Sequence, residues 1–205
     1  EIMRPYLAPD AKLHLVLNAA DVGKSDPVDV ATNQSLLFVG KLDPQKDPVR
    51  LAQAARTVDM PVTFVGGGPL RRDVEAANPG ARITGWVTPV EVQAEQRRAR
   101  ALVMTSRWYE AAPLVIFDAL AAGLPVVVPD TCAGREFVAD GETGFIYRTS
   151  EKGHLEQCLE RLKDSAIATK LGAEAYRRFW QDPPTMGKHI AGILRVYEEM
   201  LSAKQ

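Results

Sequence analysis

The chain has 205 residues, 46% of them hydrophobic, and a formal net charge of -1 at pH 7. This composition is typical of a globular domain, and the lack of any Lys/Arg block argues against a nucleic-acid partner. No apolar run approaches the roughly 18 residues of a membrane span. Because Cys132 and Cys158 are the only cysteines, we expect reduced thiols in a cytoplasmic protein, without a disulfide or zinc site.

The first 35 residues differ from the rest of the chain. The apolar stretch LHLVLN at 13–18 predicts an edge strand, and the polar, turn-rich segment 21–35 predicts a long loop. We therefore expect 1–35 to form an inter-domain edge strand and a linker.

After residue 35, short apolar runs alternate with helical patterns. Helices are predicted at 48–58, 69–77, 88–100 and 113–123, and strands at 36–40, 62–68, 81–87, 101–106, 124–130 and 143–147. This alternation is typical of a parallel sheet with helical crossovers. The sequence thus predicts a doubly wound, Rossmann-like α/β domain at 36–182.

The tail from Ser150 is predicted to be helical, with a break at Pro183-Pro184. Apolar residues then recur at helical spacing, which predicts an amphipathic helix within 183–205. Two interpretations of this apolar face stay open: it packs on its own domain, or it docks on another domain.

In such a sheet, ligands bind outside the carboxyl ends of the strands. The first of these loops, GKLDPQKD at 40–47, combines a glycine turn with Lys41 and Lys46. Two cations on one loop suit a phosphate or diphosphate, although loop lysines are also commonly just solvated.

The next loop, VGGGPL at 65–70, includes Gly67 and Gly68. Glycines allow a ligand to approach the backbone closely, but they equally allow a tight turn between strand and helix. The loop lacks the G-x-G-x-x-G spacing, which disfavours an NAD site.

The stretch EAAPLVIFDALAAG begins a helix at Pro113 and carries two acids. Alanines precede the helix, so the N–H groups near Leu114 have no side-chain cap and could bind phosphate. Glu110 either contacts a ligand or complements the helix dipole. Asp118 lies among apolar residues, where a carboxylate needs a partner: two adjacent hydroxyls, a basic side chain or a wet edge.

Taken together, these motifs resemble the C-terminal, donor-binding domain of family 4 retaining glycosyltransferases, which have the two-domain glycosyltransferase B fold. The match runs from LHLVLNAADV to the C-terminal helix and rests mainly on YEAAPLVIFDALAAGLPVVVPD. That segment is similar to the family signature of two glutamates separated by seven residues. Here the second acid is Asp118, Ala111 replaces a glycine, and Lys41 replaces an arginine.

The resemblance implies a role for each candidate residue. Lys41 and Lys46, with the backbone of Pro113 and Leu114, would hold the diphosphate of a nucleotide sugar. No metal or other cofactor is implied.

The same resemblance implies that Glu110 contacts the donor sugar and that Asp118 binds the ribose hydroxyls. The base would lie near the loops that hold Gly67, Gly68 and Trp86.

The function implied is donor binding for transfer of a hexosyl-type sugar from a UDP-, GDP- or ADP-linked donor. An N-terminal acceptor domain, not present in this sequence, would complete the enzyme, and any peripheral membrane contact would pass through it. Two alternatives stay open: a nucleotide-sugar epimerase-like half, or a nucleotide-binding module without catalysis.

Overall fold

A computed structural model describes residues 4–20, 22–108 and 114–202 of the chain. The chain divides into two compact units, Val22–Pro183 and Glu1–Asp21 with Pro184–Gln205. The larger unit contains the sheet and is described first.

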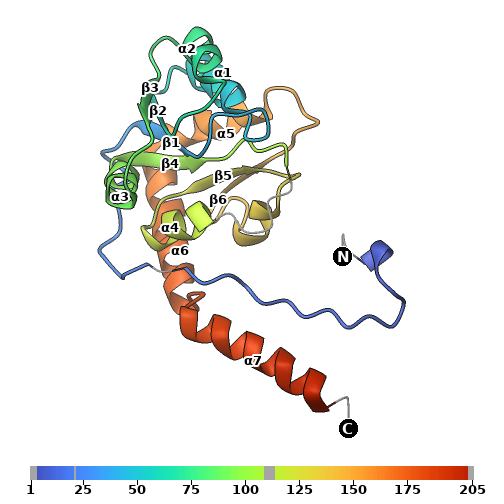
Figure 1. The fold of residues 1–205 in the computed structure, drawn as a ribbon. Coiled ribbons are helices and arrows are strands. Elements are labelled where there is room, and N and C mark those ends of the chain that lie inside the picture. Colours follow the sequence, from blue (N-terminus) through green and yellow to red (C-terminus); the bar gives the residue numbers. More distant parts are fainter. Residues whose placement is uncertain (1–3, 21, 109–113, 203–205) are drawn as a thin grey trace. The chain divides into compact units, whose positions relative to one another are not determined.

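A six-stranded parallel sheet forms the centre of the larger unit, in the order β3-β2-β1-β4-β5-β6 (Figure 1). The strands are β1 (Ser35–Val39), β2 (Val62–Val65), β3 (Arg82–Gly85), β4 (Ala99–Val103), β5 (Val126–Pro129) and β6 (Gly144–Tyr147). The doubly wound α/β fold predicted from the sequence is confirmed, with all six strands close to their predicted positions.

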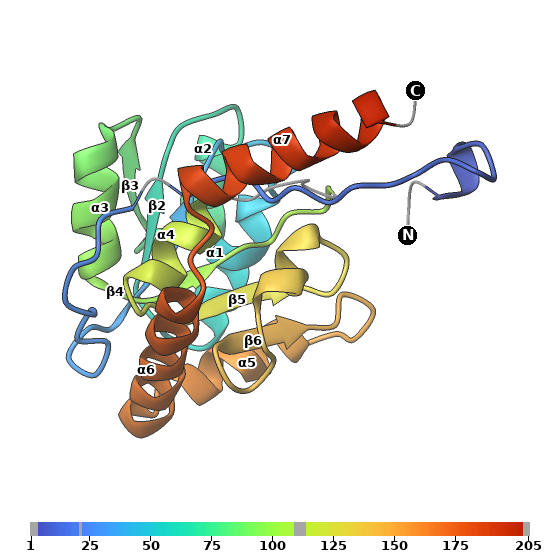
Figure 2. The ribbon, with the colours of Figure 1, turned by 90° about the horizontal axis from the view of Figure 1, so that it is seen from below.

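Helices cover both faces of this sheet (Figures 1 and 2). On one face lie α1 (Pro48–Thr57), α2 (Arg71–Ala77) and α5 (His154–Leu162); on the other lie α3 (Pro89–Arg97), α4 (Leu114–Ala121) and α6 (Ser165–Gln181). A short 3-10 helix, η2 (Ala133–Phe137), follows β5, and another, η1 (Arg4–Tyr6), lies in the smaller unit.

Local signals explain where several helices begin. Proline opens α1 and α3, where a missing N–H costs nothing. The side chains of Thr88 and Glu91 form a reciprocal capping box at the start of α3. Asp164 caps α6 and so separates it from α5.

The strands are buried because helices cover the sheet on both sides. Every residue of β2, β4 and β5 is buried, and all of them are apolar except Thr63 in β2 and Arg100 in β4. Arg100 is charged and yet only 3% exposed.

The guanidinium of Arg100 is fully engaged by the backbone around it. It donates to the hydroxyl of Ser165 and to the carbonyl oxygens of Val30, Ala31, Asn33, Leu162 and Lys163. Burial lowers its pKa, and the nearby Asp164 opposes that shift. Arg100 thus joins the segment before β1 to the junction between α5 and α6.

The edge strand predicted at 13–18 is not formed, and that prediction was wrong. The segment instead packs on α7 (Met186–Ser202) within the smaller unit. The carbonyl oxygen of Leu17 lies 2.7 Å from Nδ1 of His189, and the N–H of Ala20 donates to the carbonyl of Pro184. An edge strand needs the open edge of a sheet, and here the apolar neighbour is a helix.

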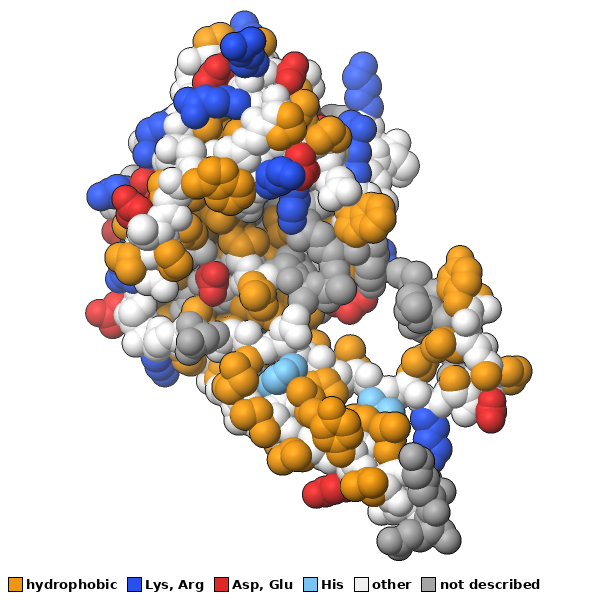
Figure 3. Space-filling view, viewed as in Figure 1, with side chains coloured by type: hydrophobic (Ala, Val, Ile, Leu, Met, Phe, Trp, Pro, Cys, Tyr) orange, Lys and Arg blue, Asp and Glu red, His pale blue; other side chains and the backbone are white. Residues whose placement is uncertain are grey.

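Helix α7 begins after the predicted break at Pro183-Pro184 and carries the predicted apolar face. Figure 3 shows hydrophobic side chains gathered along this helix. They are 48–68% exposed and comprise Met186, Ile190, Leu194, Tyr197, Met200 and Leu201. Within the described ranges, neither α7 nor any other helix has the length and apolarity to cross a membrane.

Candidate functional site

The strand order reverses between β1 and β4, the two central neighbours of the sheet. The loop after β1 leads to a helix on one face, and the loop after β4 leads to a helix on the other. The start of such a divergence, at the carboxyl edge of the sheet, is where doubly wound sheets bind ligands.

Side chains of the loop after β4 anchor the loop after β1. The hydroxyl of Thr105 donates to the carbonyls of Lys46 and Asp47, at 2.9 and 2.8 Å. Nε of Arg107 donates to Oδ2 of the buried Asp47 at 2.6 Å, while the Arg107 side chain stays 73% exposed. Arg107 therefore presents an anchored cation at the carboxyl edge, and the sequence analysis did not single it out.

The loop after β1 is also joined to the loop after β2. The N–H of Leu42 donates to the carbonyl of Gly67, and the N–H of Leu70 donates to the carbonyl of Leu42, both at 3.0 Å. A Cβ at Gly68 would overlap the backbone of Leu42, and one at Gly66 would overlap the backbone of Gly40. These two glycines are thus required by contact between the loops.

The loop after β3 is joined in turn to the loop after β2. The N–H of Gly66 donates to the carbonyl of Gly85, and Gly85 itself has a φ of 75°. Trp86 follows and is 73% exposed, with Nε1 only 3.2 Å from the position of a Cβ on Gly67. The structure therefore brings Gly67 and Trp86 together, beside the loop that carries Lys41.

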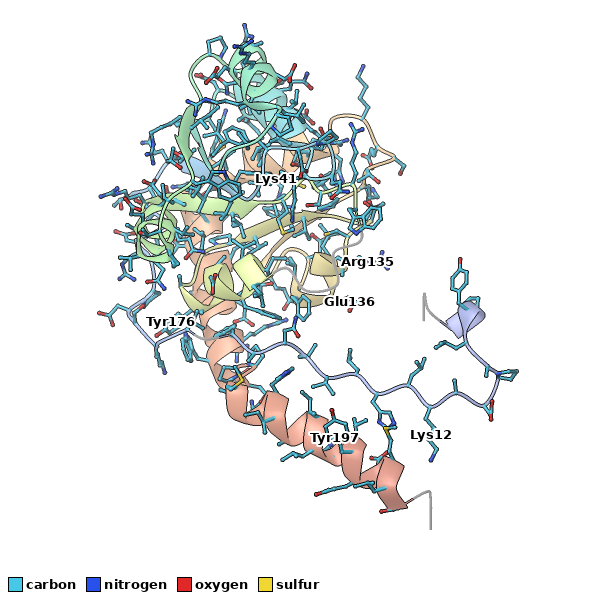
Figure 4. The ribbon with its side chains drawn as sticks, in the orientation of Figure 1. Lys12, Lys41, Arg135, Glu136, Tyr176 and Tyr197 are labelled. Carbon is cyan, nitrogen blue, oxygen red and sulfur yellow. The ribbon has the colours of Figure 1, made fainter. Side chains whose placement is uncertain are left out.

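The two predicted lysines occupy the loop after β1 (Figure 4, where Lys41 is labelled). The side chain of Lys41 is 59% exposed, and its Nζ lies 3.9 Å from Oδ2 of Asp43. Lys46 is half-buried on the same loop. With Arg107, these residues give the carboxyl edge three positively charged side chains.

Asp118 lies on α4, half-buried, and borders a cavity of about 360 Å³ between α3, α4 and the segment 22–25. Within the described ranges, no hydrogen bond or ion pair reaches its carboxylate. Burial therefore raises its pKa. The other lining residues are Val22, Gly23, Lys24, Ser25, Gln93, Gln96, Arg97, Ala121 and Ala122.

The raised pKa of Asp118 predicts a pH-dependent gain in stability for Asp118→Asn. The folded protein holds the proton more tightly than the unfolded chain, so stability falls as pH rises from the unfolded pKa through the folded pKa. We expect the variant to melt above wild type at pH 7, with a smaller difference at pH 4. Melting curves at both values check this, with the exposed Asp26→Asn as control; equal melting temperatures for Asp118→Asn and wild type at pH 7 would contradict it.

Three further predicted site residues are Glu110, Pro113 and Leu114. Glu110 and Pro113 fall outside the described residues, and Leu114 is the first residue of α4 and half exposed. In the described part of the chain, no group of three His, Cys, Asp or Glu side chains is placed to hold a metal ion.

Known proteins share both the sequence and the fold. Residues 33–165 match the family model described as "Glycosyl transferases group 1". A GDP-mannose-dependent alpha-mannosyltransferase of Mycobacterium tuberculosis is 32% identical over 117 residues, which are 57% of this chain and 31% of that protein. The chain spans less than half the length of the first curated relatives it matches.

Two solved structures show the likeness in fold. Sucrose-phosphate synthase from Thermosynechococcus elongatus superposes with a TM-score of 0.79 at 21% identity, over 98% of this chain and 56% of that one. Anabaena Alr3699/HepE, solved in complex with UDP, gives a TM-score of 0.65 at 17% identity, over 84% and 50% of the two chains. The family match covers well over half of the sequence and confirms the resemblance of its motifs, so the chain belongs to the glycosyl transferases of group 1.

Proposed function

We propose that this chain is the donor-binding part of a glycosyltransferase. It would hold a nucleotide sugar while a hexosyl-type sugar passes to an acceptor with retention of configuration. Family membership supports this, as do a relative named for GDP-mannose and a structural neighbour solved with UDP. Since the chain spans less than half of its first curated relatives, we further propose that sugar transfer requires another domain.

The observation that carries the proposal is the cationic loop at the reversal of strand order. Lys41 and Lys46 lie on it, and Arg107 holds it in place through Asp47. A nucleoside diphosphate placed there gains charge-assisted hydrogen bonds.

The same cations would act during the reaction. When the bond between the anomeric carbon and the diphosphate oxygen breaks, negative charge develops on that oxygen. Preorganised positive side chains stabilise this charge, with the first N–H groups of α4 as further donors. The proposal assigns this work to the protein and to no resident metal.

Neighbouring residues would bind the ribose and the base of the donor. Asp118 would accept hydrogen bonds from the ribose hydroxyls, which would resolve the cost of its unpaired, half-buried carboxylate. The base would lie near Gly67 and the exposed ring of Trp86. Contact of Glu110 with the donor sugar stays a prediction from the resemblance.

Thermal unfolding with millimolar UDP, GDP or ADP tests the proposal. A ligand at ~100 times its Kd stabilises the folded state by about 2.7 kcal/mol, so we expect a clear shift with at least one of them. Lys41→Ala should weaken that binding about tenfold, because the variant loses one exposed charge-assisted hydrogen bond.

The matched control is Lys170→Ala, an exposed lysine on α6. It should bind as wild type does. A folded chain that none of the three nucleotides stabilises would contradict the proposal, as would equal affinities for the two variants. Sugar transfer by this chain alone would contradict the need for another domain.

A further inference from the structure

Arg135 is an exposed residue of η2, the short helix that follows β5 (Figure 4, where it is labelled). Its Nη1 donates to the carbonyl oxygen of Asp130 at 2.7 Å, and Asp130 is the first residue after β5. The guanidinium is therefore held at the carboxyl edge of the sheet, beside the end of β5. Its other two nitrogens, Nε and Nη2, have no hydrogen bond or ion pair in the described part of the chain.

The carboxylate of Asp130 does not take up this free edge of the guanidinium. Its Oδ1 accepts from the backbone N–H and the hydroxyl of Thr149, at 3.0 and 2.9 Å. Burial alone would raise the pKa of Asp130, but these two bonds and the charge of Arg135 bring it below its usual value. Asp130 thus attracts Arg135 from a distance and leaves Nε and Nη2 available to a ligand.

η2 packs directly on the beginning of α4. The rings of Phe137 and Phe117 meet edge to face, with their centroids 4.8 Å apart. A Cβ on Gly134 would lie only 2.6 Å from Cδ1 of Ile116, so glycine is what lets η2 approach α4 this closely. Ile116 and Phe117 belong to the first turn of α4, and Gly134 and Phe137 stand on either side of Arg135 in the sequence. Arg135 therefore borders the start of α4.

The cations at the carboxyl edge follow the order of three adjacent strands. The loops after β1, β4 and β5 carry in turn Lys41 with Lys46, Arg107, and Arg135. The proposed function places the diphosphate at the lysines and the start of α4, and the base on the other side, near Trp86. In a nucleotide sugar the base and the sugar are attached to opposite ends of the diphosphate. The sugar would therefore extend towards β5 and η2.

We propose that the sugar of the donor carries a carboxylate, as in a nucleotide-linked uronic acid, and that Arg135 selects it. Nε–H and Nη2–H lie on one edge of the planar guanidinium and can donate in parallel to the two oxygens of a carboxylate. The bond from Nη1 to Asp130 fixes that edge in advance. This inference rests on the proposed donor-binding function and adds to it the class of sugar that is bound.

Calorimetry on this chain tests the inference with a hexose and its uronic acid on the nucleotide that binds best, for example UDP-glucose and UDP-glucuronate. Wild type should bind the uronic acid form about tenfold more tightly, as expected for hydrogen bonds between charged partners. Arg135→Gln keeps a polar side chain without the charge. It should lose most of this preference, while its affinity for the neutral form stays unchanged. Arg135→Lys, which has the charge but not the planar fork, should keep part of the preference.

The matched control is Arg148→Gln. Arg148 directly follows β6, the next strand of the sheet, and its exposed side chain is already paired with Glu151 at 2.6 Å. This variant should keep the wild-type preference. An unchanged preference in Arg135→Gln would overturn the inference, as would equal or weaker binding of the uronic acid form by wild type. If neither the nucleotides nor their sugar forms bind wild type, the proposed function falls as well, and this outcome is distinct from the other two.

Discussion

Arg100→Met is expected to lower the free energy of unfolding of the chain by about 3 kcal/mol or more. The guanidinium donates to five backbone carbonyls and one hydroxyl, from two separate stretches of the chain, 30–33 and 162–165. Methionine has a similar volume but no donor, so these buried acceptors lose their partner. Each such loss carries a desolvation penalty that packing does not offset.

Urea denaturation followed by circular dichroism measures the effect. The control is Arg98→Met, two residues earlier, where the arginine is 74% exposed and lies 3.7 Å from Glu95. Removal of an exposed pair of this kind should change stability by about 0.5 kcal/mol at most. If Arg100→Met were no more destabilising than Arg98→Met, the guanidinium would not be holding these segments together.

Gly66→Ala is expected to destabilise the fold by about 3 kcal/mol and to abolish nucleotide binding. Gly66 has a φ of 137°, which side chains rarely adopt, and its added Cβ would overlap the carbonyl oxygen of Gly40. Because the overlapping group belongs to the backbone, only a separation of the loops after β1 and β2 relieves the overlap. That movement would shift Lys41 away from Trp86.

The control for this variant is Gly141→Ala. Gly141 has a φ of 75°, yet nothing lies within 4 Å of an added Cβ, so the variant carries the conformational cost alone. We expect a loss of about 1 kcal/mol and unchanged nucleotide binding. Thermal melts with and without nucleotide compare the two variants. Equal destabilisation would show that the contact between loops contributes nothing.

Much of the fold was predictable because its signals are local. Strands such as Val126–Pro129 are apolar on both faces, and the helices α1 and α3 begin at proline. The wrong prediction at 13–18 has the same origin. An apolar stretch marks a segment that will be covered, but it does not say whether a sheet or a helix covers it.

The candidate site was predictable only in part. Lys41 was identified because it directly follows a predicted strand, and Trp86 because the family resemblance places the base near it. Arg107 was not, since it belongs to no motif. Its importance depends on the ion pair with Asp47, sixty positions earlier in the sequence.

By itself, the sequence determined the family, the alternation of strands and helices, and the loops that reach the carboxyl edge. These follow from periodicity and short motifs, which act over a few residues. The tertiary structure alone decided that β1 lies beside β4, that three glycine-bearing loops adjoin, and that Gln96 and Asp118 line one cavity. Such pairings depend on which distant elements pack together, and no local pattern encodes that choice.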